Sequence, residues 1–315
     1  MKTKLVLAGT VAAACLAAAS VLLNGTPEAD PSVSRPPILG IANIALRVSN
    51  AAEAHHFFGQ ILGFDELPLN ETAMDKMKYA YYKVNDDQFI KVSPTQMSSA
   101  EDGLIHIAFR TTNARALRSY MAARGVAVPA SVEKDPQGDL SFNITDPAGH
   151  QVQFIQYLSG SVESRNRGKY LATGCVSHEI IHAGETVSDR ATMNHLYGDI
   201  LGFREMWYGG MTNKQTDWVD MVVPNGQNWL EYMLHVHNPS PRQLGVMDHF
   251  SLGVKDPREV YATVKARGLE NVSRPQIGRD GKWQLNLYDQ ALTRVEVMAF
   301  KPVRKPCCSP MRSFR

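Results

Sequence analysis

Two histidines and two glutamates stand in apolar, strand-like segments of the latter half of the chain. His249 lies in "MDHFSLGV" and His182 in "EIIHAGETVSD", while Glu231 and Glu296 lie in "NWLEYML" and "TRVEVMAF". Imidazoles and carboxylates are the side chains that bind Fe(II), Mn(II), Ni(II), Zn(II) or Co(II). Burying carboxylates without a cation is costly, so these residues need partners. Whether they share a metal depends on the elements that carry them.

An internal repeat links these segments to the first half of the chain. "HHFFGQILGFDEL" is echoed by "NHLYGDILGFREM", so that His56 and His195 are separated by 139 residues, as are Leu62 and Leu201. Two further pairs follow in the same order, "GLIHIAFRTTNARALRSYMAARGV" with "VMDHFSLGVKDPREVYATVKARGL", and "LSFNITDPAGHQVQFIQY" with "LNLYDQALTRVEVMAF". A repeat of this kind indicates two halves with the same fold.

Each half divides again into two similar units. "AEAHHFFGQILGF", "ALRSYMAARGV" and "EVYATVKARGL" have apolar residues at helical spacing and a Gly stop. "DPAGHQVQF" is typical of a turn that leads into a last strand. The sequence therefore predicts an α+β protein of four βαβββ modules, which begin near Ile38, Gly103, Val176 and Val246.

This organisation resembles the vicinal oxygen chelate superfamily, which includes glyoxalase I, extradiol dioxygenases, epimerases and fosfomycin- and bleomycin-resistance proteins. The "ILGF" helix end, the "DHFSLGVKD" strand and the Asp-containing turn before the last strand carry the resemblance, which covers residues 38–300. It implies that paired modules form two open barrels, one at residues 38–160 and one at 175–302, followed by a tail at 303–315. Such a barrel binds one divalent metal ion.

The resemblance also implies where the metal ligands lie, since they come from the first and last strands of each module. In the second half these positions hold His182, Glu231, His249 and Glu296. Two histidines and one carboxylate favour ferrous iron, whereas a set that includes Glu231 is similar to glyoxalase I. There a carboxylate leaves the metal to take a proton, so Glu231 and Glu296 are the candidate catalytic residues. Iron, manganese, zinc and nickel all remain open.

The first half departs from this pattern. Its corresponding positions hold Asn43, either Lys91 or Val92, His106 and Gln153. One histidine with amides and a lysine offers too little negative charge for a metal site. Residues 38–160 are therefore expected to be a degenerate domain without metal, with a structural role or a role at the entrance to the second barrel.

Three functions are compatible with the expected site. The first is proton transfer by a lyase or isomerase on a small-molecule substrate chelated through vicinal oxygens. The second is extradiol-type ring cleavage with Fe(II), which the metal-free first half favours. Against it, the position of the usual tyrosine holds Asn286, and the strand "WVDMVV" lacks the usual histidine, so Tyr288, His235 or His237 would have to substitute. The third is non-enzymatic binding, as among resistance proteins.

Five residues near the expected site are candidates for substrate contact. An aromatic ring can stack on a planar ligand, and an arginine can hold an anionic group through two hydrogen bonds. A carboxylate of the strand "WVDMVV" is expected to face the same pocket. The candidates are Trp218, Asp220, Arg279, Asn286 and Tyr288.

The composition and the two ends of the chain bound the remaining classes. The 315 residues carry a formal net charge of +2 without a basic stripe, so nucleic acid is not an expected partner. Lys2 and Lys4 precede an uncharged run at 5–23, so residues 1–23 are expected to be a signal peptide or a membrane anchor, followed by a linker at 24–37. This predicts a periplasmic or secreted protein, monomeric or homodimeric. Adjacent cysteines rarely bond to each other, so Cys307 and Cys308 are not expected to pair.

Overall fold

The computed structural model of the chain describes residues 34–69, 79–94 and 103–314. The expected leader at 1–23 and nearly all of the linker at 24–37 lie outside the described residues. Within the described part of the chain, no helix combines the length and the apolar composition needed to cross a membrane.

The first half contains two βαβββ modules. The first module is built from β1 (Ile38–Val48), α1 (Ala51–Ala54) continuing as η1 (His55–Ile61), β2 (Asp65–Glu66), β3 (Ala80–Lys83) and β4 (Phe89–Pro94). The second is built from β5 (Leu104–Thr111), α3 (Ala114–Ala122), β6 (Glu133–Lys134), β7 (Leu140–Thr145) and β8 (Gln151–Gln156). A short helix, α4 (Val162–Arg165), follows the second module.

The second half repeats this order. The third module comprises β9 (Ile180–Thr186), α5 (Arg190–Met193) continuing as η2 (Asn194–Ile200), β10 (Arg204–Gly209), β11 (Trp218–Val222) and β12 (Trp229–Met233). After α6 (Pro241–Met247), the fourth comprises β13 (His249–Val254), α7 (Pro257–Ala266), β14 (Gln276–Ile277), β15 (Trp283–Tyr288) and β16 (Arg294–Ala299). The predicted α+β class is confirmed.

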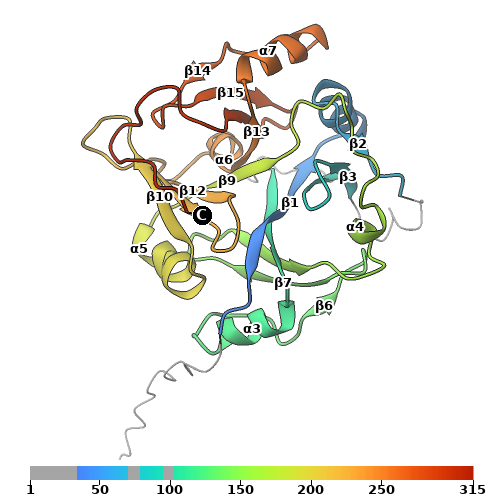
Figure 1. Cartoon of the computed structure of the whole chain (residues 1–315), viewed down its shortest axis with the longest axis vertical. Coiled ribbons are helices and arrows are strands. Elements are labelled where there is room, and N and C mark those ends of the chain that lie inside the picture. Colours follow the sequence, from blue (N-terminus) through green and yellow to red (C-terminus); the bar gives the residue numbers. More distant parts are fainter. Residues whose placement is uncertain (1–33, 70–78, 95–102, 315) are drawn as a thin grey trace, which may run out of the picture.

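Each half forms one eight-stranded sheet (Figure 1). The strand orders are β2-β3-β4-β1-β5-β8-β7-β6 and β10-β11-β12-β9-β13-β16-β15-β14. The first strand of every module pairs in parallel with the last strand of the same module. The two first strands of a half pair with each other in antiparallel fashion. The first and last strands of both modules therefore meet at the centre of each sheet.

The helix that follows the first strand of each half has an unexpected geometry. Its last turns are π-helical, with hydrogen bonds of 2.9 Å from Leu62 N to Phe57 O and from Leu201 N to Leu196 O. Gly63 and Gly202 then end the two helices with φ angles of +79° and +77°, which favour glycine. The sequence predicted the helices and their glycine stops, but not the extra residue in each turn.

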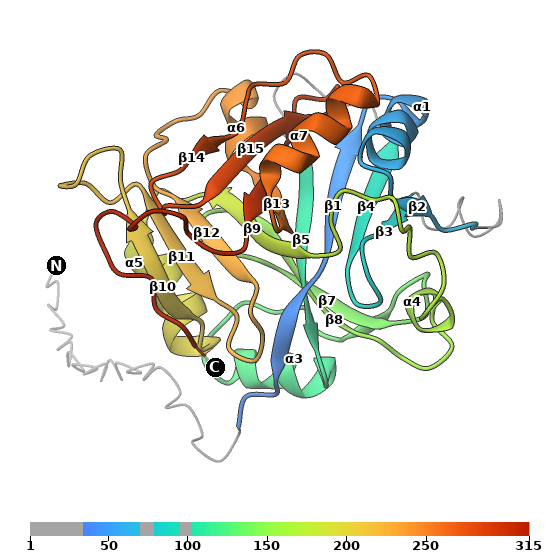
Figure 2. The ribbon, with the colours of Figure 1, turned by 45° about the horizontal axis from the view of Figure 1, so that its top comes forward.

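Side chains alternate between a shared core and the inner face of each sheet. On β16, Val295 and Val297 are fully buried in the core, whereas Glu296 lies on the opposite face. The core is continuous between the halves, because Phe109 of β5 packs edge-on against Phe203 with ring centroids 5.3 Å apart. Figure 2 shows that helices of the two halves lie in pairs, with α7 beside α1 and α3 near α5.

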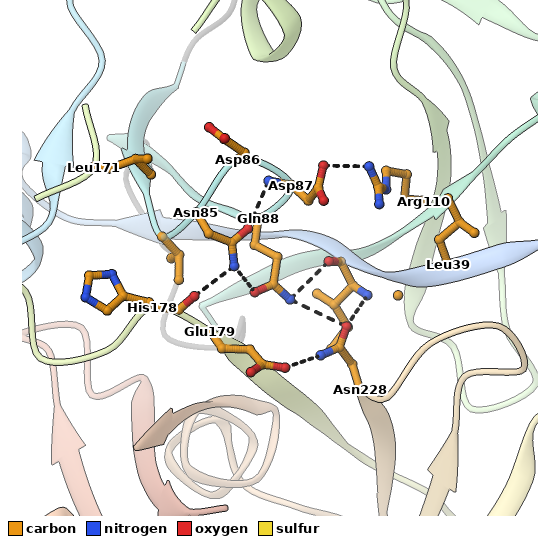
Figure 3. Close-up of a pocket in the computed structure, with 13 residues that line it drawn as sticks. Leu39, Asn85, Asp86, Asp87, Gln88, Arg110, Leu171, His178, Glu179 and Asn228 are labelled. Carbon is orange, nitrogen blue, oxygen red and sulfur yellow. Dashed lines mark hydrogen bonds and ion pairs between the residues drawn. The ribbon is translucent and has the colours of Figure 1, made fainter. Parts of the chain in front are cut away.

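A reciprocal pair of amide side chains joins the two central strands across the halves (Figure 3). Gln88, just before β4, donates to Ile180 O and accepts from Ile180 N, both at 2.8 Å. Asn228, just before β12, accepts from Ile41 N at 3.1 Å and donates to Ile180 O at 2.9 Å. These residues occupy matching places in the repeat and line a groove of about 590 Å³ between the halves.

The chain end at 303–314 folds back along the second half. Val303 N donates to Gly281 O at 2.8 Å, and Arg312 N donates to Met206 O at 2.9 Å. Contrary to expectation, Cys307 and Cys308 are joined by a disulfide. The left-handed backbone of Cys308, with φ of 69°, lets the two adjacent side chains face each other.

Replacing Asn228 should weaken the junction between the halves. Asn228→Ala leaves the buried Ile41 N without its acceptor, so we expect the free energy of unfolding to fall by about 1–3 kcal/mol. Urea denaturation followed by circular dichroism measures the change. The neighbouring exposed Gln227 offers a matched control, and Gln227→Ala should change the stability by less than about 0.5 kcal/mol. Equal effects of the two substitutions would contradict the role assigned to Asn228.

Candidate metal centre

Strand register brings the two histidines and two glutamates together at the centre of the second sheet. Gly184 of β9 pairs with Glu231 of β12 on one side and with His249 of β13 on the other. Ser251 of β13 likewise pairs with both His182 of β9 and Glu296 of β16. Because residues two apart on a strand share a face, all four side chains point toward the inside of the barrel.

The four side chains converge on one small volume. The Nε2 atom of His182 lies 3.2 Å from His249 Nε2, 3.2 Å from Glu296 Oε2 and 3.8 Å from Glu231 Oε2. The Nε2 atom of His249 lies 3.5 Å from Glu231 Oε2 and 3.9 Å from Glu296 Oε2. Donors that share one cation at about 2.0–2.2 Å from it lie roughly 3–4 Å apart. The separations among His182, His249 and Glu296 fit a single divalent metal ion, and Glu231 lies beside this group.

A glycine makes room for the His249 ring. A Cβ atom at residue 184 would collide with Cε1 of the imidazole, which lies directly across from Gly184 in the antiparallel ladder. The strand therefore needs a residue without a side chain at this position. Gly184 fixes the ring close to the sheet, beside the other three donors.

The protonation of both histidines suits metal binding. His249 Nδ1 lies 2.6 Å from Met247 O, so its proton is donated there and the Nε2 lone pair faces the other donors. Burial lowers the pKa of His182, and burial with the nearby charge of Arg294 lowers the pKa of His249 well below its ordinary value. Both rings are therefore neutral at pH 7, which is the form that binds a metal.

Glu231 and Asp220 favour the neutral form when no metal is present, whereas the pKa of Glu296 is lowered beside His182 and Arg294 despite its burial. Burial, followed by the charges of Asp220 and Glu296, raises the pKa of Glu231 well above its ordinary value. Burial likewise raises the pKa of Asp220 to about 8. A divalent cation would offset the cost of ionising these buried carboxylates. His182, His249 and Glu296, whose donor atoms lie within 4.8 Å of one another, could thus hold a metal ion.

A cavity of about 170 Å³ opens beside the four donors. Glu231 and Glu296 form part of its wall, and the predicted substrate residues Trp218, Asp220 and Arg279 also line it. Arg279 has little hydrogen-bonding capacity to spare, because its Nε donates to Gly210 O at 2.8 Å and its Nη2 donates to Asn213. The cavity is large enough for a small ligand that reaches the donors.

The remaining candidates lie nearby but do not line this cavity. Asn286 of β15 pairs with Glu296, and its buried Oδ1 has no hydrogen-bond partner among the described residues. Tyr288 lies further along β15 and is 39% exposed. His235 contacts Trp218 edge-on, with ring centroids 5.4 Å apart. Its imidazole is not part of the cavity wall.

Two cationic residues beside the site were not among the candidates. Arg294 lines the cavity, and Lys282 Nζ lies 4.4 Å from the Trp229 ring centroid and 3.8 Å from Asp280. The sequence held a signal for Arg294, which precedes Glu296 by two residues and so shares its face of β16. Lys282 comes from a turn outside the repeated strand pattern, so alternation could not have identified it.

Comparison with known proteins supports the expected family. Residues 40–154 match the model of the Glyoxalase/Bleomycin resistance protein/Dioxygenase superfamily. These residues are a domain of that superfamily. No curated protein sequence matches the chain. The matched residues lie in the first half, and the second half repeats the same strand order.

Solved structures of extradiol dioxygenases share this two-domain arrangement. Homoprotocatechuate 2,3-dioxygenase from Arthrobacter globiformis aligns with a TM-score of 0.65 and 17% identity, over 89% of this chain and 86% of that chain. A variant of the enzyme from Brevibacterium fuscum aligns with a TM-score of 0.64 and 17% identity, over 86% of this chain and 74% of that chain. At this identity the likeness establishes the fold.

The glyoxalase-superfamily domain of the first half has a different set of residues at the matching positions. Ala45 pairs with both Lys91 and His106, as Gly184 pairs with Glu231 and His249, so Lys91 rather than Val92 is the counterpart of Glu231. Ala45 also has a Cβ atom where the second half needs a glycine. His106 instead lies with its Nε2 3.0 Å from Asn43 Oδ1.

A buried ion pair fills this first-half position. Lys91 Nζ lies 3.3 Å from Oε1 of Glu163, which α4 inserts from beyond the second module. Asp139 lies close to Glu163 and accepts from Leu158 N at 2.6 Å. Burial and the charge of Glu163 raise the pKa of Asp139 to about 8. The lysine thus supplies, from within the chain, the positive charge that this barrel needs.

The titration of Asp139 should make stability depend on pH. Because its folded pKa of about 8 exceeds the ordinary value of 3.8, the folded state holds a proton that the unfolded state releases between these pH values. Stability therefore falls as pH rises from about 4 to about 8. Asp139→Asn removes this dependence on pH. The difference in unfolding free energy, variant minus natural protein, should therefore rise by more than ~1 kcal/mol as the pH rises over that range.

Urea titrations at pH 5 and pH 8 measure this difference. Asp199→Asn is a suitable control, since Asp199 is exposed on the surface of η2. A constant difference between Asp139→Asn and the natural protein at both pH values would show that Asp139 is ionised in the fold.

Proposed function

We propose that the second half binds one divalent metal ion through His182, His249 and Glu296, with Glu231 as a fourth, exchangeable ligand. The observation that carries this proposal is the convergence of four donor atoms, with separations of 3.2–3.9 Å, beside a cavity. The reaction is proton transfer on a small molecule chelated through neighbouring oxygens, as in a lyase or isomerase.

The cavity walls support proton transfer. A bound divalent cation would polarise a carbonyl oxygen of the substrate and so acidify the adjacent carbon. Glu231 lines the cavity and is the residue that accepts the proton, because burial makes its carboxylate more basic than an exposed one. Asp220 lies directly opposite Glu231 in the sheet and keeps the proton near it. Trp218 lines the same cavity.

Ring cleavage of a catechol is the second candidate. It is supported by the fold shared with extradiol dioxygenases and by the two-histidine, one-glutamate group. Among the described residues that line the cavity, however, none is a histidine or a tyrosine. Proton transfer needs only the carboxylates that are present, so it is the first candidate. Binding without turnover, as in a resistance protein, is the remaining alternative.

The metal site is tested by a pair of histidine substitutions. His249→Ala removes a donor of the second half, so the purified protein should lose stoichiometric metal. His106→Ala changes the matching residue of the first half and should leave the metal content unchanged. Elemental analysis after dialysis measures the metal bound per chain. Full metal content in both variants would place the metal elsewhere.

The reaction class is tested by assaying a hemithioacetal and a catechol with the metal-loaded protein. Oxygen-independent turnover of the hemithioacetal supports proton transfer, and Glu231→Gln should then lower kcat by about 100-fold or more while metal remains bound. Oxygen uptake with a yellow ring-fission product supports ring cleavage instead. Binding of either compound without turnover supports a binding protein and contradicts both enzymatic proposals.

A further inference from the structure

Arg294 occupies an unusual position within the donor cluster. Its Nη2 lies 2.7 Å from Nε2 and 2.8 Å from Nδ1 of His249. Its Nε is buried and has no hydrogen-bond partner among the described residues. Among these residues its guanidinium also forms no ion pair within 4.0 Å, although Glu231 and Glu296 line the same cavity. The guanidinium therefore lies against the imidazole, nearly equidistant from its two nitrogens, and has donors to spare.

This position of Arg294 is electrostatically unfavourable for a metal on His249. The Nδ1 proton of His249 is donated to Met247 O, so Nε2 offers one lone pair. A cation about 2.0–2.2 Å from Nε2 on this lone pair would lie close to the guanidinium, whose Nη2 is 2.7 Å from the same nitrogen. Two positive charges this close in a buried site also repel each other strongly. Metal binding thus requires Arg294 to move away from the ring.

Without a metal, the arginine has a clear electrostatic role. Its positive charge favours the ionised forms of Glu231 and Glu296, which would otherwise be buried together without a cation. A buried carboxylate pair is costly unless such a charge is near. Arg294 therefore stabilises the metal-free site and competes with the metal for it.

The cavity offers Arg294 a second position. The side chain already lines the cavity of about 170 Å³, together with Trp218 and Gln284. A displaced guanidinium would present a planar set of donors to any ligand in that space, and this geometry matches a carboxylate. Arg279 lines the same cavity, but its guanidinium is engaged with Gly210 and Asn213. Arg294 is the arginine of this cavity with uncommitted donors.

We propose that Arg294 leaves His249 when a divalent metal binds and then holds an anionic group, such as a carboxylate, of the molecule that chelates the metal. Arg294 would thus set both the affinity for metal and the preference for anionic ligands. This inference rests on the proposed metal site and adds to it a class of substrate.

The competition is tested by the affinity for Zn²⁺. Arg294→Met removes the charge with little loss of apolar volume, and Arg294→Lys is the matched variant that keeps the charge. Competition against a chromophoric chelator should show at least about tenfold tighter binding by the Met variant, while the Lys variant stays within about threefold of the natural protein. If the Met variant is too unstable without metal to be purified, Arg294→Gln serves in the same assay.

Two outcomes of this assay have different meanings. In the first outcome, the natural protein binds Zn²⁺ and the neutral variants bind it with the same or weaker affinity. This result would overturn the competition while leaving the metal site in place. No Zn²⁺ bound by any of the proteins would overturn the proposed metal site and this inference with it.

The anionic preference is tested with two chelators that differ by one carboxylate. Calorimetry of the Zn²⁺-loaded protein with catechol and with 3,4-dihydroxybenzoate compares them without turnover. The natural protein should bind 3,4-dihydroxybenzoate at least about tenfold more tightly, since the guanidinium can form charge-assisted hydrogen bonds with the added carboxylate. The neutral variants should lose this preference and keep their affinity for catechol. A preference that survives in these variants would show that another group binds the carboxylate.

Discussion

The need of buried carboxylates for positive charge is the constraint on which the interior of the second barrel depends. Glu231, Glu296 and Asp220 point to the same side of one sheet, and the two imidazoles beside them are neutral because burial disfavours their charge. The ionised form of such a group is stabilised by a nearby cation, whether a metal ion or the guanidinium of Arg294. Three features place the donors around one point: the strand register, Gly184, and the hydrogen bond from His249 Nδ1 to Met247 O.

The two halves satisfy the same constraint in different ways. In the first half, Lys91 stands on the strand position of Glu231, and α4 supplies Glu163 as its partner. A covalently attached ammonium group stands there, at the position where the second half could hold a metal ion. The backbone frame is unchanged, because the same residue of the first strand pairs with both neighbours in each half. A repeated fold has thus kept its sheet while the charge at its centre has been exchanged.

The sequence predicted much of this frame, because repeats and strand alternation are visible in residue order. The family resemblance then implied His182, His249, Glu231 and Glu296 as ligands, and the structure brings these residues within 4 Å of one another in most pairs. Choosing between Lys91 and Val92 required the strand register, which one loop residue can shift. Glu163 and Lys282 could not be assigned, since they reach the two sites from segments outside the repeat. The π-helical turns and the Cys307–Cys308 bond depend on local backbone geometry that residue type alone does not specify.

The continuous core between the sheets bears on how the protein folds and how it can be dissected. Phe109 and Phe203 lie in one buried cluster, and the amides of Gln88 and Asn228 tie each central strand to the opposite half. Cutting the chain between the two halves would expose an apolar face on both fragments. It would also leave backbone groups of Ile41 and Ile180 unpaired. The halves are therefore a single cooperative unit, and neither barrel is an independently portable module despite the duplicated strand order.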